Sequence, residues 1–335
     1  MITENELAKK ISKFSRSAFA HLPTPLERLN LLSSDLNRND IWVKREDTTG
    51  LAFGGNKARH YEFEMPHILE SGYDVIINIM DYYSNNARMT AAAANKFGIT
   101  YVLILKNAKG KSKQGNRLLD ELLGSEIHLL DTEESKDALE YGKTLAKNLI
   151  KSGKKPYLLQ EHRFPEIVGT IAYVNATLEL REQIKSEGIE NVHIYGVAGR
   201  SLCGLILGAK NLGLDWKFTG VMVTDDPDLD SYIFNNAEYI KDLIDLEYTY
   251  SRDDLGIKDQ YIGEGYGILT PSVKSTILKL ARLEGLFVDP NYSGPVLNAI
   301  IDDVENDHIN ENDNIVFLHT GGLPSIFSYA EELTS

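Results

Sequence analysis

The sequence predicts an α/β fold with mostly parallel strands. Short apolar runs alternate with longer amphipathic stretches, which is typical of β-α-β units, and no internal repeat or low-complexity tract interrupts them. The length of 335 residues suits two packed lobes or one large α/β unit. Hydrophobic residues make up 42% of the chain, an ordinary share for a globular protein with a sizeable core.

The expected strands are short apolar runs. The run at 74–79 reads DVIINI, a continuous pattern that is typical of a strand buried on both faces. Taken in chain order, we expect strands at 40–44, 74–79, 101–105, 127–130, 193–195, 218–223 and 315–319.

The expected helices lie between these strands. The segment RMTAAAANKF is rich in alanine, the strongest helix former, and Gly98 ends it. The next helical segment carries four leucines on one side. We expect helices at 88–97, 115–123, 171–187 and 201–211. Ligands of such folds bind beyond the carboxyl ends of the strands. The junctions after Ile79, Tyr195 and Leu318 are therefore the places to look for chemistry.

The charge and cysteine content argue against several classes of function. Lys and Arg total 35 and Asp and Glu total 49, a net charge of -14 that disfavours binding to nucleic acids and anionic membranes. The single cysteine, Cys203, cannot form an internal disulfide or a cysteine metal cluster, and we expect it to pack in a helix. We predict no bound metal. No apolar run follows the basic residues near the N-terminus, so we expect no signal peptide, no membrane span and a cytoplasmic protein.

The segment FGGNKAR places Gly54 and Gly55 before Lys57. Adjacent glycines allow positive φ angles and close approach of the backbone to a ligand. A lysine at such a turn forms a Schiff base when its ammonium is desolvated and its pKa falls. A solvated lysine on a surface turn gives the same pattern, so this motif alone leaves both interpretations open.

Ser84, Asn85 and Asn86 follow a strand and open a helix. Serine and asparagine are favoured helix caps. The unpaired amides of a first helical turn attract an anion, and a substrate carboxylate suits this place. Plain capping explains the same residues.

A second glycine-rich turn, GVAGRSLCG at 196–204, also leads from a strand into a helix. Small residues allow backbone N–H groups to surround a phosphate, and the helix N-terminus adds a favourable potential. Arg200 either supplies charge to that phosphate or points into solvent. Such turns are common, so a packed turn without a ligand is the alternative.

Three hydroxyl side chains stand in glycine-rich loops. Thr320 follows the last strand, where its hydroxyl can bond to a ring nitrogen without placing a charge there. Tyr266 and Tyr292 are suited to stack on a ring or to move protons. Since the chain has 17 tyrosines, a structural role is the usual one for any of them.

Together these motifs resemble those of the fold type II, tryptophan-synthase-β-like, pyridoxal-phosphate (PLP) enzymes. Within them, the chain resembles the branch of 1-aminocyclopropane-1-carboxylate deaminase and D-cysteine desulfhydrase. The matching segments span nearly the whole chain and follow one another in the same order as in the family. Its segments are LPTPLERLNLLSSDL, IWVKREDTTGLAFGGNKARHYEFE, YSNNARMTAAAANKFG, QGNRLLDELLGSEIH, EGYG, EGLFVDPNYSG and FLHTGGLPSIFSY.

The resemblance implies an architecture and a set of roles. It implies two three-layer α/β/α domains, a large one from residues 1–52 and 167–335 and a small one from 53–166, in a homodimer. Lys57 matches the Schiff-base lysine. The expected substrate site consists of Ser84, Asn85, Asn86, Tyr83, Tyr266 and Tyr292, in which Asn85 also lies beside the phenolic oxygen of PLP.

The resemblance also implies how the cofactor is held. The phosphate loop matches Gly196, Val197, Ala198, Gly199, Arg200 and Ser201. Thr320 and Ser293 match positions near the pyridine nitrogen. The deaminases carry glutamate at the latter position, which keeps that nitrogen protonated and deepens the electron sink. The hydroxyl of Ser293 favours α,β-elimination over ring opening.

The chain departs from the family pattern around the substrate and the phosphate, although Lys57 is unaffected. The departures are Met80-Asp81-Tyr82-Tyr83, Val197, Ala198, Arg200, Glu161-His162-Arg163-Phe164 and Pro295. We therefore expect a pocket for a different or larger amino acid than D-cysteine. The residues expected to build it are Tyr82, Tyr83, His162, Arg163 and Arg200.

The resulting hypothesis is a PLP-dependent lyase or deaminase that acts on a small amino acid. D-cysteine-desulfhydrase-like elimination would yield a keto acid and ammonia. The alternatives are β-replacement, a cyclising or γ-acting enzyme, and a non-catalytic descendant that binds a small molecule. A nicotinamide-binding oxidoreductase is disfavoured because the turn after Tyr195 lacks the third glycine at dinucleotide spacing.

Overall fold

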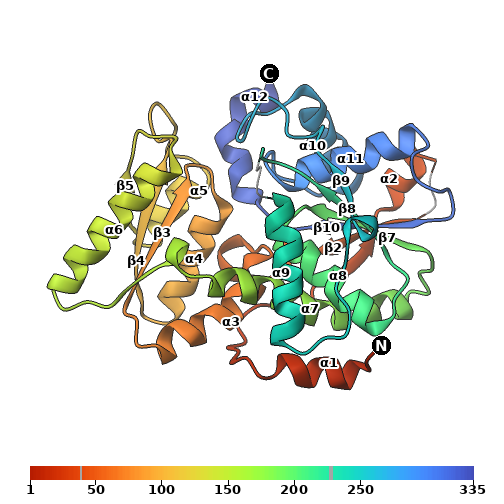
Figure 1. The fold of residues 1–335 in the computed structure, drawn as a ribbon. Helices are drawn as coiled ribbons and strands as arrows, with labels where there is room; N and C mark the ends of the chain where they lie inside the picture. Colours follow the sequence, from red (N-terminus) through yellow and green to blue (C-terminus); the bar gives the residue numbers. More distant parts are fainter. Residues whose placement is uncertain (38–39, 226–228) are drawn as a thin grey trace.

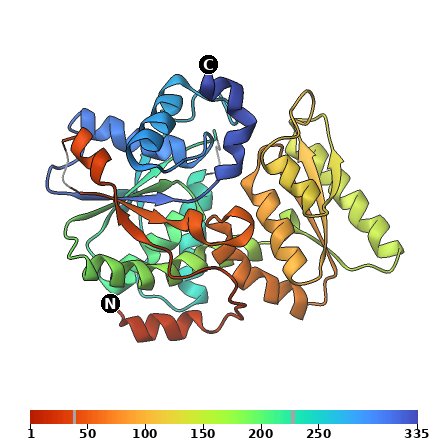
Figure 2. The ribbon, with the colours of Figure 1, turned by 180° about the vertical axis from the view of Figure 1, so that it is seen from behind.

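The computed structural model describes residues 1–37, 40–225 and 229–335. Two lobes lie side by side, each built on one β-sheet (Figure 1). Both chain ends lie on the larger lobe, as the view from behind also shows (Figure 2). The α/β fold with mostly parallel sheets confirms the prediction from the sequence.

The larger sheet has six strands, and only its first pair, β1 with β2, is antiparallel. Its strands, in spatial order, are β1 (Leu26–Arg28), β2 (Ile41–Arg45), β10 (Asn314–His319), β7 (Val192–Val197), β8 (Lys217–Val221) and β9 (Gly256–Lys258). The two outer strands were not predicted, since each has only three residues and no apolar run of its own.

The smaller sheet has four strands, all parallel. Its strands, in spatial order, are β5 (Glu126–Leu129), β4 (Thr100–Lys106), β3 (Val75–Asp81) and β6 (Pro156–Leu158). Alternate side chains of β3 enter two different core clusters, Ile76 in one and Ile77 in the other. Both faces of this sheet are therefore covered, as the apolar run at 74–79 predicts.

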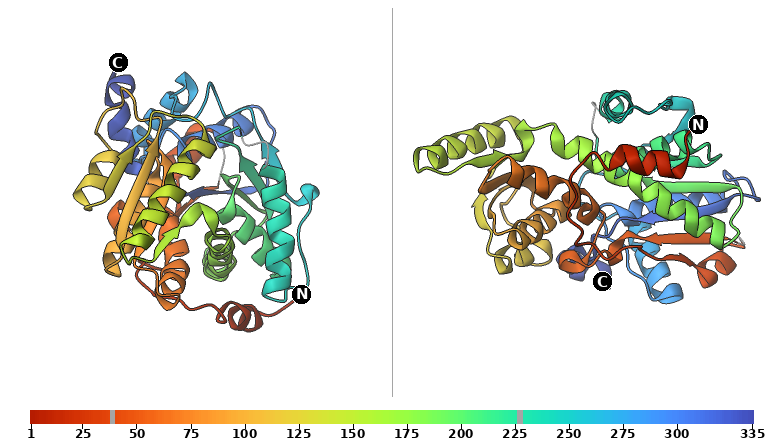
Figure 3. Two further views of the ribbon diagram at one scale, coloured as in Figure 1. Left: turned by 60° about the vertical axis from the view of Figure 1, so that its left-hand side comes forward. Right: turned by 90° about the horizontal axis from the view of Figure 1, so that it is seen from below.

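Helices cover both faces of each sheet, which gives three layers in each lobe (Figure 3). On the larger sheet, one face packs on α1 (Glu4–Ile11), α7 (Phe164–Ser186), α8 (Arg200–Leu212) and α9 (Leu229–Leu243). The other face packs on α2 (Asn30–Asp35), α10 (Pro271–Glu284) and α11 (Ser293–Glu305). The smaller sheet lies between α6 (Ser135–Lys151) and a group formed by α3 (Lys57–Glu70), α4 (Asn85–Lys96) and α5 (Asn116–Leu122). The chain ends with α12 (Ala330–Thr334).

The helix α3 was not predicted, and its composition explains why. It is buried along most of its length, yet the buried positions include Arg59, His60, Glu62 and Glu64. It also contains Pro66, which usually interrupts a helix. Ala58, Tyr61, Met65 and Ile68 do follow helical spacing, but the charged residues buried between them and Pro66 obscure this apolar stripe.

Close contact between α7 and α8 depends on two glycines. A Cβ atom on Gly204 would lie 2.3 Å from the carbonyl oxygen of Thr170 and 2.5 Å from Cβ of Tyr173. One turn later, a Cβ atom on Gly208 would lie 2.3 Å from Oγ1 of Thr177. These helices share more contacts than any other pair of elements, and they place the start of α8 at the candidate site.

We expect Gly204→Ala to lower the free energy of unfolding by about 1–3 kcal/mol, because the new methyl group meets backbone atoms that cannot move aside. Gly142→Ala in α6 is the matched control. Its new Cβ would meet only the ends of flexible side chains, at 3.1 Å or more, and alanine favours a helix. Urea unfolding measures both. Equal stability of the two variants would contradict this account of the α7–α8 contact.

In the described part of the chain, each helix is too short or too polar to cross a lipid bilayer.

Candidate active site

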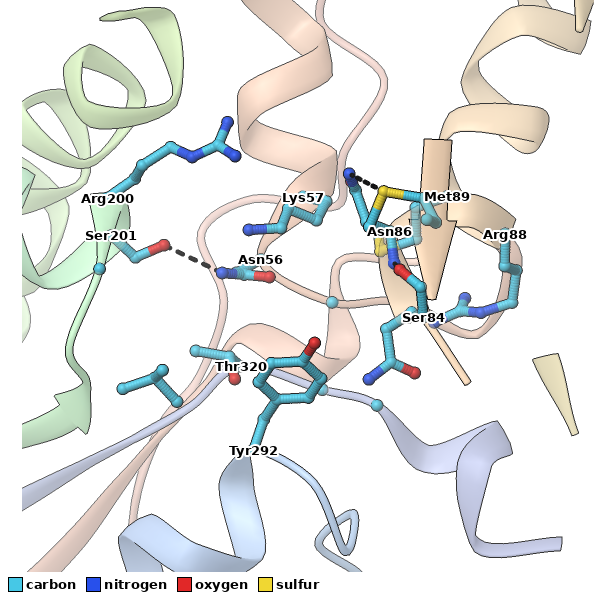
Figure 4. A pocket seen from close by; sticks show the side chains of 17 residues that line it. Asn56, Lys57, Ser84, Asn86, Arg88, Met89, Arg200, Ser201, Tyr292 and Thr320 are labelled. Atoms are coloured by element: carbon cyan, nitrogen blue, oxygen red, sulfur yellow. Dashed lines mark hydrogen bonds between the residues drawn. The ribbon is translucent and has the colours of Figure 1, made fainter. Parts of the chain in front are cut away.

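A cavity of about 240 Å³ lies where the ends of β3, β7 and β10 meet the start of α3 (Figure 4). Segments from both lobes line it. The predicted site residues that line it are Lys57, Ser84, Asn85, Asn86, Val197, Gly199, Arg200, Ser201, Tyr292 and Thr320. It is also lined by Gly55, Asn56, Met80, Arg88, Met89, Gly321 and Gly322. The structure thus brings together motifs that lie up to 263 residues apart in the sequence.

A constrained loop delivers Lys57 to the cavity. Gly54 has a φ of 73°, and a Cβ atom there would lie 1.8 Å from the carbonyl oxygen of Asp47, so only glycine fits. Thr49 holds the backbone of Gly55 through two hydrogen bonds. The hydroxyl of Thr49 donates to the carbonyl oxygen of Gly55 at 2.8 Å and accepts from the backbone nitrogen of Gly55 at 2.9 Å. Lys57 follows as the first residue of α3.

The C-terminal loop closes against this lysine loop. The backbone nitrogen of Asn56 donates to the carbonyl oxygen of Thr320 at 3.0 Å. A Cβ atom on Gly321 would lie 2.7 Å from Cα of Gly55, so glycine is required for the two backbones to touch. This contact brings Thr320 and Lys57 to opposite sides of one cavity (Figure 4).

The electrostatic surroundings of Lys57 favour its neutral amine. Desolvation is the main cause, and the guanidinium of Arg200 adds to it. The carboxylate of Glu64 opposes both, and together they lower the pKa of Lys57 to about 7. A lysine with such a pKa is a competent nucleophile and base near neutral pH.

We expect labelling of Lys57 by an amine-reactive reagent, in the cofactor-free protein, to rise with pH through a midpoint near 7. A solvated lysine would show a midpoint of about 10.4. Arg200→Met removes a nearby cation and should move the midpoint up, whereas Glu64→Gln removes an anion and should move it down. Peptide mapping at a series of pH values measures all three. A wild-type midpoint near 10 would contradict this electrostatic account.

Ser84 caps the helix α4 and sets the position of the two asparagines. Its hydroxyl accepts a hydrogen bond from the backbone nitrogen of Asn86 at 3.2 Å. Oδ1 of Asn85 accepts from Nδ2 of Asn116 at 2.7 Å, which leaves the amide nitrogen of Asn85 to face the site. The helix start presents hydroxyl, amide and backbone N–H groups to an anion.

The start of α8 forms the opposite wall. Gly199 precedes the helix in an extended conformation, and a Cβ atom there would meet nothing within 4 Å. The hydroxyl of Ser201 accepts from Nδ2 of Asn56 at 2.9 Å, so the two lobes are linked beside Lys57. Arg200 donates to the carbonyl oxygen of Pro165 at 3.1 Å and also lines the cavity.

Two tyrosines form a hydrogen-bonded pair at the base of the site. The hydroxyl of Tyr292 donates to that of Tyr266 at 3.0 Å. Desolvation raises the pKa of Tyr292 to about 12 and that of Tyr266 well above its ordinary value. Both are therefore protonated near neutral pH and can act as proton donors.

Five predicted site residues lie outside the cavity wall. Gly196 packs within β7, and Ala198 donates its backbone N–H to Val221. The ring of Tyr83 lies against Tyr329, and Tyr266 lies behind Tyr292. The hydroxyl of Ser293 is buried against Asp289 and the carbonyl oxygen of Gly321.

Reasoning from the sequence missed Asn56, Met80, Arg88 and Met89 in the cavity wall. It also missed three side chains near the site, namely Asn116, which holds Asn85, and His60 and Glu64 on α3. Helical spacing carries a signal for the last two. If Lys57 begins a helix, then positions 60 and 64 lie on the same side of it as the lysine, three and seven residues later.

Comparison with known proteins agrees with this geometry. Residues 18–321 match the family model described as pyridoxal-phosphate dependent enzyme. The chain belongs to this family. It is an enzyme that uses PLP as its cofactor.

The relatives cover nearly the whole chain. It is 33% identical over 326 residues to a putative 1-aminocyclopropane-1-carboxylate deaminase of Pyrococcus abyssi, with 96% of each chain covered. It is 32% identical over 332 residues to the D-cysteine desulfhydrase of Salmonella typhimurium, with 95% of this chain and 97% of the relative covered. A solved structure of an ACC deaminase homologue superposes with a TM-score of 0.87 at 29% identity, covering 99% of both chains. The diaminopropionate ammonia lyase of Escherichia coli shares the fold, with a TM-score of 0.69 at 16% identity, 99% of this chain and 91% of the lyase being covered.

The residues of the cavity fit PLP. Lys57 would supply a neutral amine for the aldehyde group, which requires a desolvated lysine. Gly199, Arg200 and Ser201 would provide an open helix N-terminus, a guanidinium and a hydroxyl for the phosphate. Thr320 presents a hydroxyl to the cavity. The substitutions relative to the family pattern in this loop therefore leave a set of groups suited to a phosphate.

Proposed function

We propose that this enzyme is a lyase that catalyses α,β-elimination on a small amino acid and releases a keto acid and ammonia. The observation that carries the proposal is the pairing of Lys57, with a pKa of about 7, and Tyr292, with a pKa of about 12, in one cavity. One group is a base and the other an acid at neutral pH. The similarity to D-cysteine desulfhydrase supports the same reaction.

The start of α4 binds the substrate carboxylate in this proposal. Ser84, Asn85 and Asn86 offer polar groups at a helix N-terminus, where an anion is favoured. A carboxylate held at this wall would place the Cα atom of the substrate in the cavity that Lys57 also lines (Figure 4). Positioning of this kind accounts for a large part of enzymatic rate enhancement.

Lys57 and Tyr292 divide the proton transfers between them. When bound, PLP withdraws electrons from the Cα–H bond, so that this weak acid can be deprotonated. The Nζ amine of Lys57 takes the Cα proton, because its low pKa leaves the amine free near neutral pH. Tyr292, which keeps its proton, donates its Oη proton to the departing group at Cβ.

The absence of a carboxylate from the cavity wall favours elimination over ring opening. Among the described residues that line the cavity, none is Asp or Glu. Ser293 stands at the position where the deaminases that this chain resembles carry glutamate. Thr320 presents a hydroxyl to the cavity and the hydroxyl of Ser293 is turned to Asp289, so neither supplies the fixed proton that deepens the electron sink.

A panel of D- and L-amino acids tests the proposal. Each compound carries a leaving group at Cβ, such as a thiol, a thioether or chloride, and each is scored for keto acid, ammonia and any new amino acid. Elimination predicts equal amounts of keto acid and ammonia. We expect Tyr292→Phe to slow the compounds with poor leaving groups more than β-chloroalanine, whose chloride needs no proton. Formation of a new amino acid from added thiol, without ammonia, would instead establish β-replacement.

We also propose the domain division and the assembly that the family resemblance implies. All four strands of the smaller sheet fall within residues 53–166, and the strands of the larger sheet lie outside that range. We propose a homodimer in the cytoplasm. Sedimentation at about twice the chain mass of 37.5 kDa is the expected result, and sedimentation at the mass of one chain would contradict it.

A further inference from the structure

A second cavity, of about 160 Å³, adjoins the PLP pocket. It lies between α3, β3 and the start of α7, and we call it the Glu64 cavity. It shares Met80, Asn86 and Arg200 with the PLP pocket, so the two spaces are adjacent. Its volume corresponds to about five water molecules at roughly 30 Å³ each, enough for a short chain of heavy atoms.

Glu64 is the unusual group in this wall. Its side chain is 2% exposed, and its Oε1 atom has no hydrogen-bond partner among the residues that the structure describes. Desolvation raises the pKa of Glu64 to about 7, although Arg200 and Lys57 both lower it. A buried carboxyl oxygen without a donor costs stability, so a native protein that keeps one usually has a use for it.

The placement of Glu64 on α3 directs it toward the substrate. It lies seven residues after Lys57, two turns along the same side of the helix and about 10 Å further along its axis. Side chains on a helix lean toward its N-terminus, so the carboxyl group leans back toward the lysine. The mutual effect of these two residues on each other's pKa agrees with this proximity.

The neighbouring polar groups are already occupied. The hydroxyl of Tyr61 donates to Oδ1 of Asn86 at 2.7 Å. The amide nitrogen of Gln160 donates to Oδ1 of Asn78 at 3.0 Å and to the carbonyl oxygen of Ile79 at 2.9 Å. The carboxyl group of Glu64 thus lines a cavity beside these paired groups, and the side chains of His60, His162, Glu166 and Arg200 complete its polar lining.

We propose that the Glu64 cavity binds the end of the substrate side chain, and that this end is a terminal amino group that donates hydrogen bonds to Glu64. The inference deepens the proposed function, since it names the substrate class of the same site. That class comprises amino acids whose Cβ substituent is a chain of about four atoms with an ammonium at its end. It agrees with the larger substrate that the altered residues around the site predict.

Two compounds of the same shape test this proposal. S-(2-aminoethyl)cysteine ends in an ammonium, and S-propylcysteine replaces that ammonium with a methyl group. Both are assayed as both enantiomers for keto acid. We expect kcat/KM to be about 10- to 100-fold higher for the aminoethyl compound, the size of a hydrogen bond to a charged group.

Binding is measured separately from turnover. Lysine and 2-aminoheptanoate have the same shapes as the two test compounds but no sulfur leaving group at Cβ. Calorimetric titration of the PLP-loaded protein should show tighter binding of lysine, by a similar factor. This measurement does not depend on elimination, so it tests the cavity even if the proposed reaction is wrong.

Glu64→Gln keeps the shape of the side chain and removes its charge. We expect this variant to lose most of the preference for the amino-terminated compounds, measured as the ratio of the two kcat/KM values. Glu70→Gln makes the same change at an exposed position of the same helix and should keep the wild-type preference. Because the preference is first measured in the wild type, the test stands even if the Glu64 variant does not fold.

The outcomes separate the two proposals. The Glu64 inference alone would be overturned if the enzyme forms keto acid from β-chloroalanine but shows equal kcat/KM for the two thioethers and equal affinity for lysine and 2-aminoheptanoate. The elimination proposal alone would be overturned if no compound yields keto acid, while lysine still binds more tightly than 2-aminoheptanoate and Glu64→Gln abolishes that difference. A preference that survives in Glu64→Gln would also overturn the role of this residue.

Discussion

We expect Lys57→Ala to abolish the covalent attachment of the cofactor and to lower kcat/KM by about 10²- to 10⁴-fold or more, because in our proposal one side chain is both the attachment point and the base. The purified wild type should absorb near the edge of the visible range, and borohydride should remove this band. The variant should lack the band.

A second lysine and a chemical rescue distinguish loss of the amine from loss of the fold. Lys147→Ala, at an exposed position of α6, should keep the band and the activity. Added methylamine should partly restore the activity of Lys57→Ala, because it supplies a free amine to an intact cavity. A Lys57→Ala protein that still shows a borohydride-sensitive band would place the attachment elsewhere.

The second large effect is on stability. Glu46 is fully buried in η1 (Glu46–Thr48), where it accepts hydrogen bonds from Arg59 at 2.6 and 2.8 Å and from the hydroxyl of Tyr173 at 2.6 Å. Arg59, which is 2% exposed, also pairs with Glu179 at 2.8 Å. The network joins the larger sheet, the helix that carries Lys57, and α7. It therefore holds the lysine helix against the larger lobe.

We expect Glu46→Gln to lower the free energy of unfolding by about 3–5 kcal/mol, because it leaves the buried guanidinium of Arg59 with one anion fewer. Glu27→Gln is the control. Glu27 is exposed and pairs with Arg45 at 2.7 Å, and such pairs contribute about 0–1 kcal/mol. Urea unfolding at pH 7 measures both. A loss below about 1 kcal/mol in Glu46→Gln would contradict the structural importance of the network.

The same network predicts how stability depends on pH. Burial raises the pKa of Glu46, but Arg59 and Lys44 outweigh it, and the pKa falls to about 2. A carboxyl group with a lowered pKa stabilises the folded state fully above its unfolded pKa of about 4.3. This contribution to the free energy of unfolding is lost as the pH falls toward 2. The wild type should therefore lose stability over this pH range, whereas Glu46→Gln, which lacks the contribution at every pH, should lose less.

The sequence predicted those parts of the fold that follow from local apolar patterns. The run at 74–79 and the alanine-rich segment before Gly98 correspond to β3 and α4. The helix α3 was not found in this way, because buried charged residues and Pro66 interrupt its apolar positions. Arg59 pairs with a glutamate 120 residues away, a contact that a local pattern cannot contain.

The candidate site was predicted where a motif carries its own signal. Lys57, Ser84 and Thr320 each stand beside glycines or at a helix start, and all three line one cavity. Glu64 carries only the signal of helical spacing from Lys57, and Asn116, although it follows Gly115 at a helix start, holds Asn85 through a contact that forms only after folding. Ser293 shows the reverse case, since its motif is distinctive but its hydroxyl is buried against Asp289.

The most direct test of the central claim is to find where PLP is attached. The PLP-loaded wild type is reduced with borohydride, digested with trypsin and mapped by mass spectrometry. The account predicts one pyridoxyl-phosphate label, carried by Lys57 in the peptide spanning residues 46–59, where the reduced lysine resists cleavage. A label on another lysine, or no label after incubation with excess PLP, would contradict the assignment of this cavity as the catalytic centre.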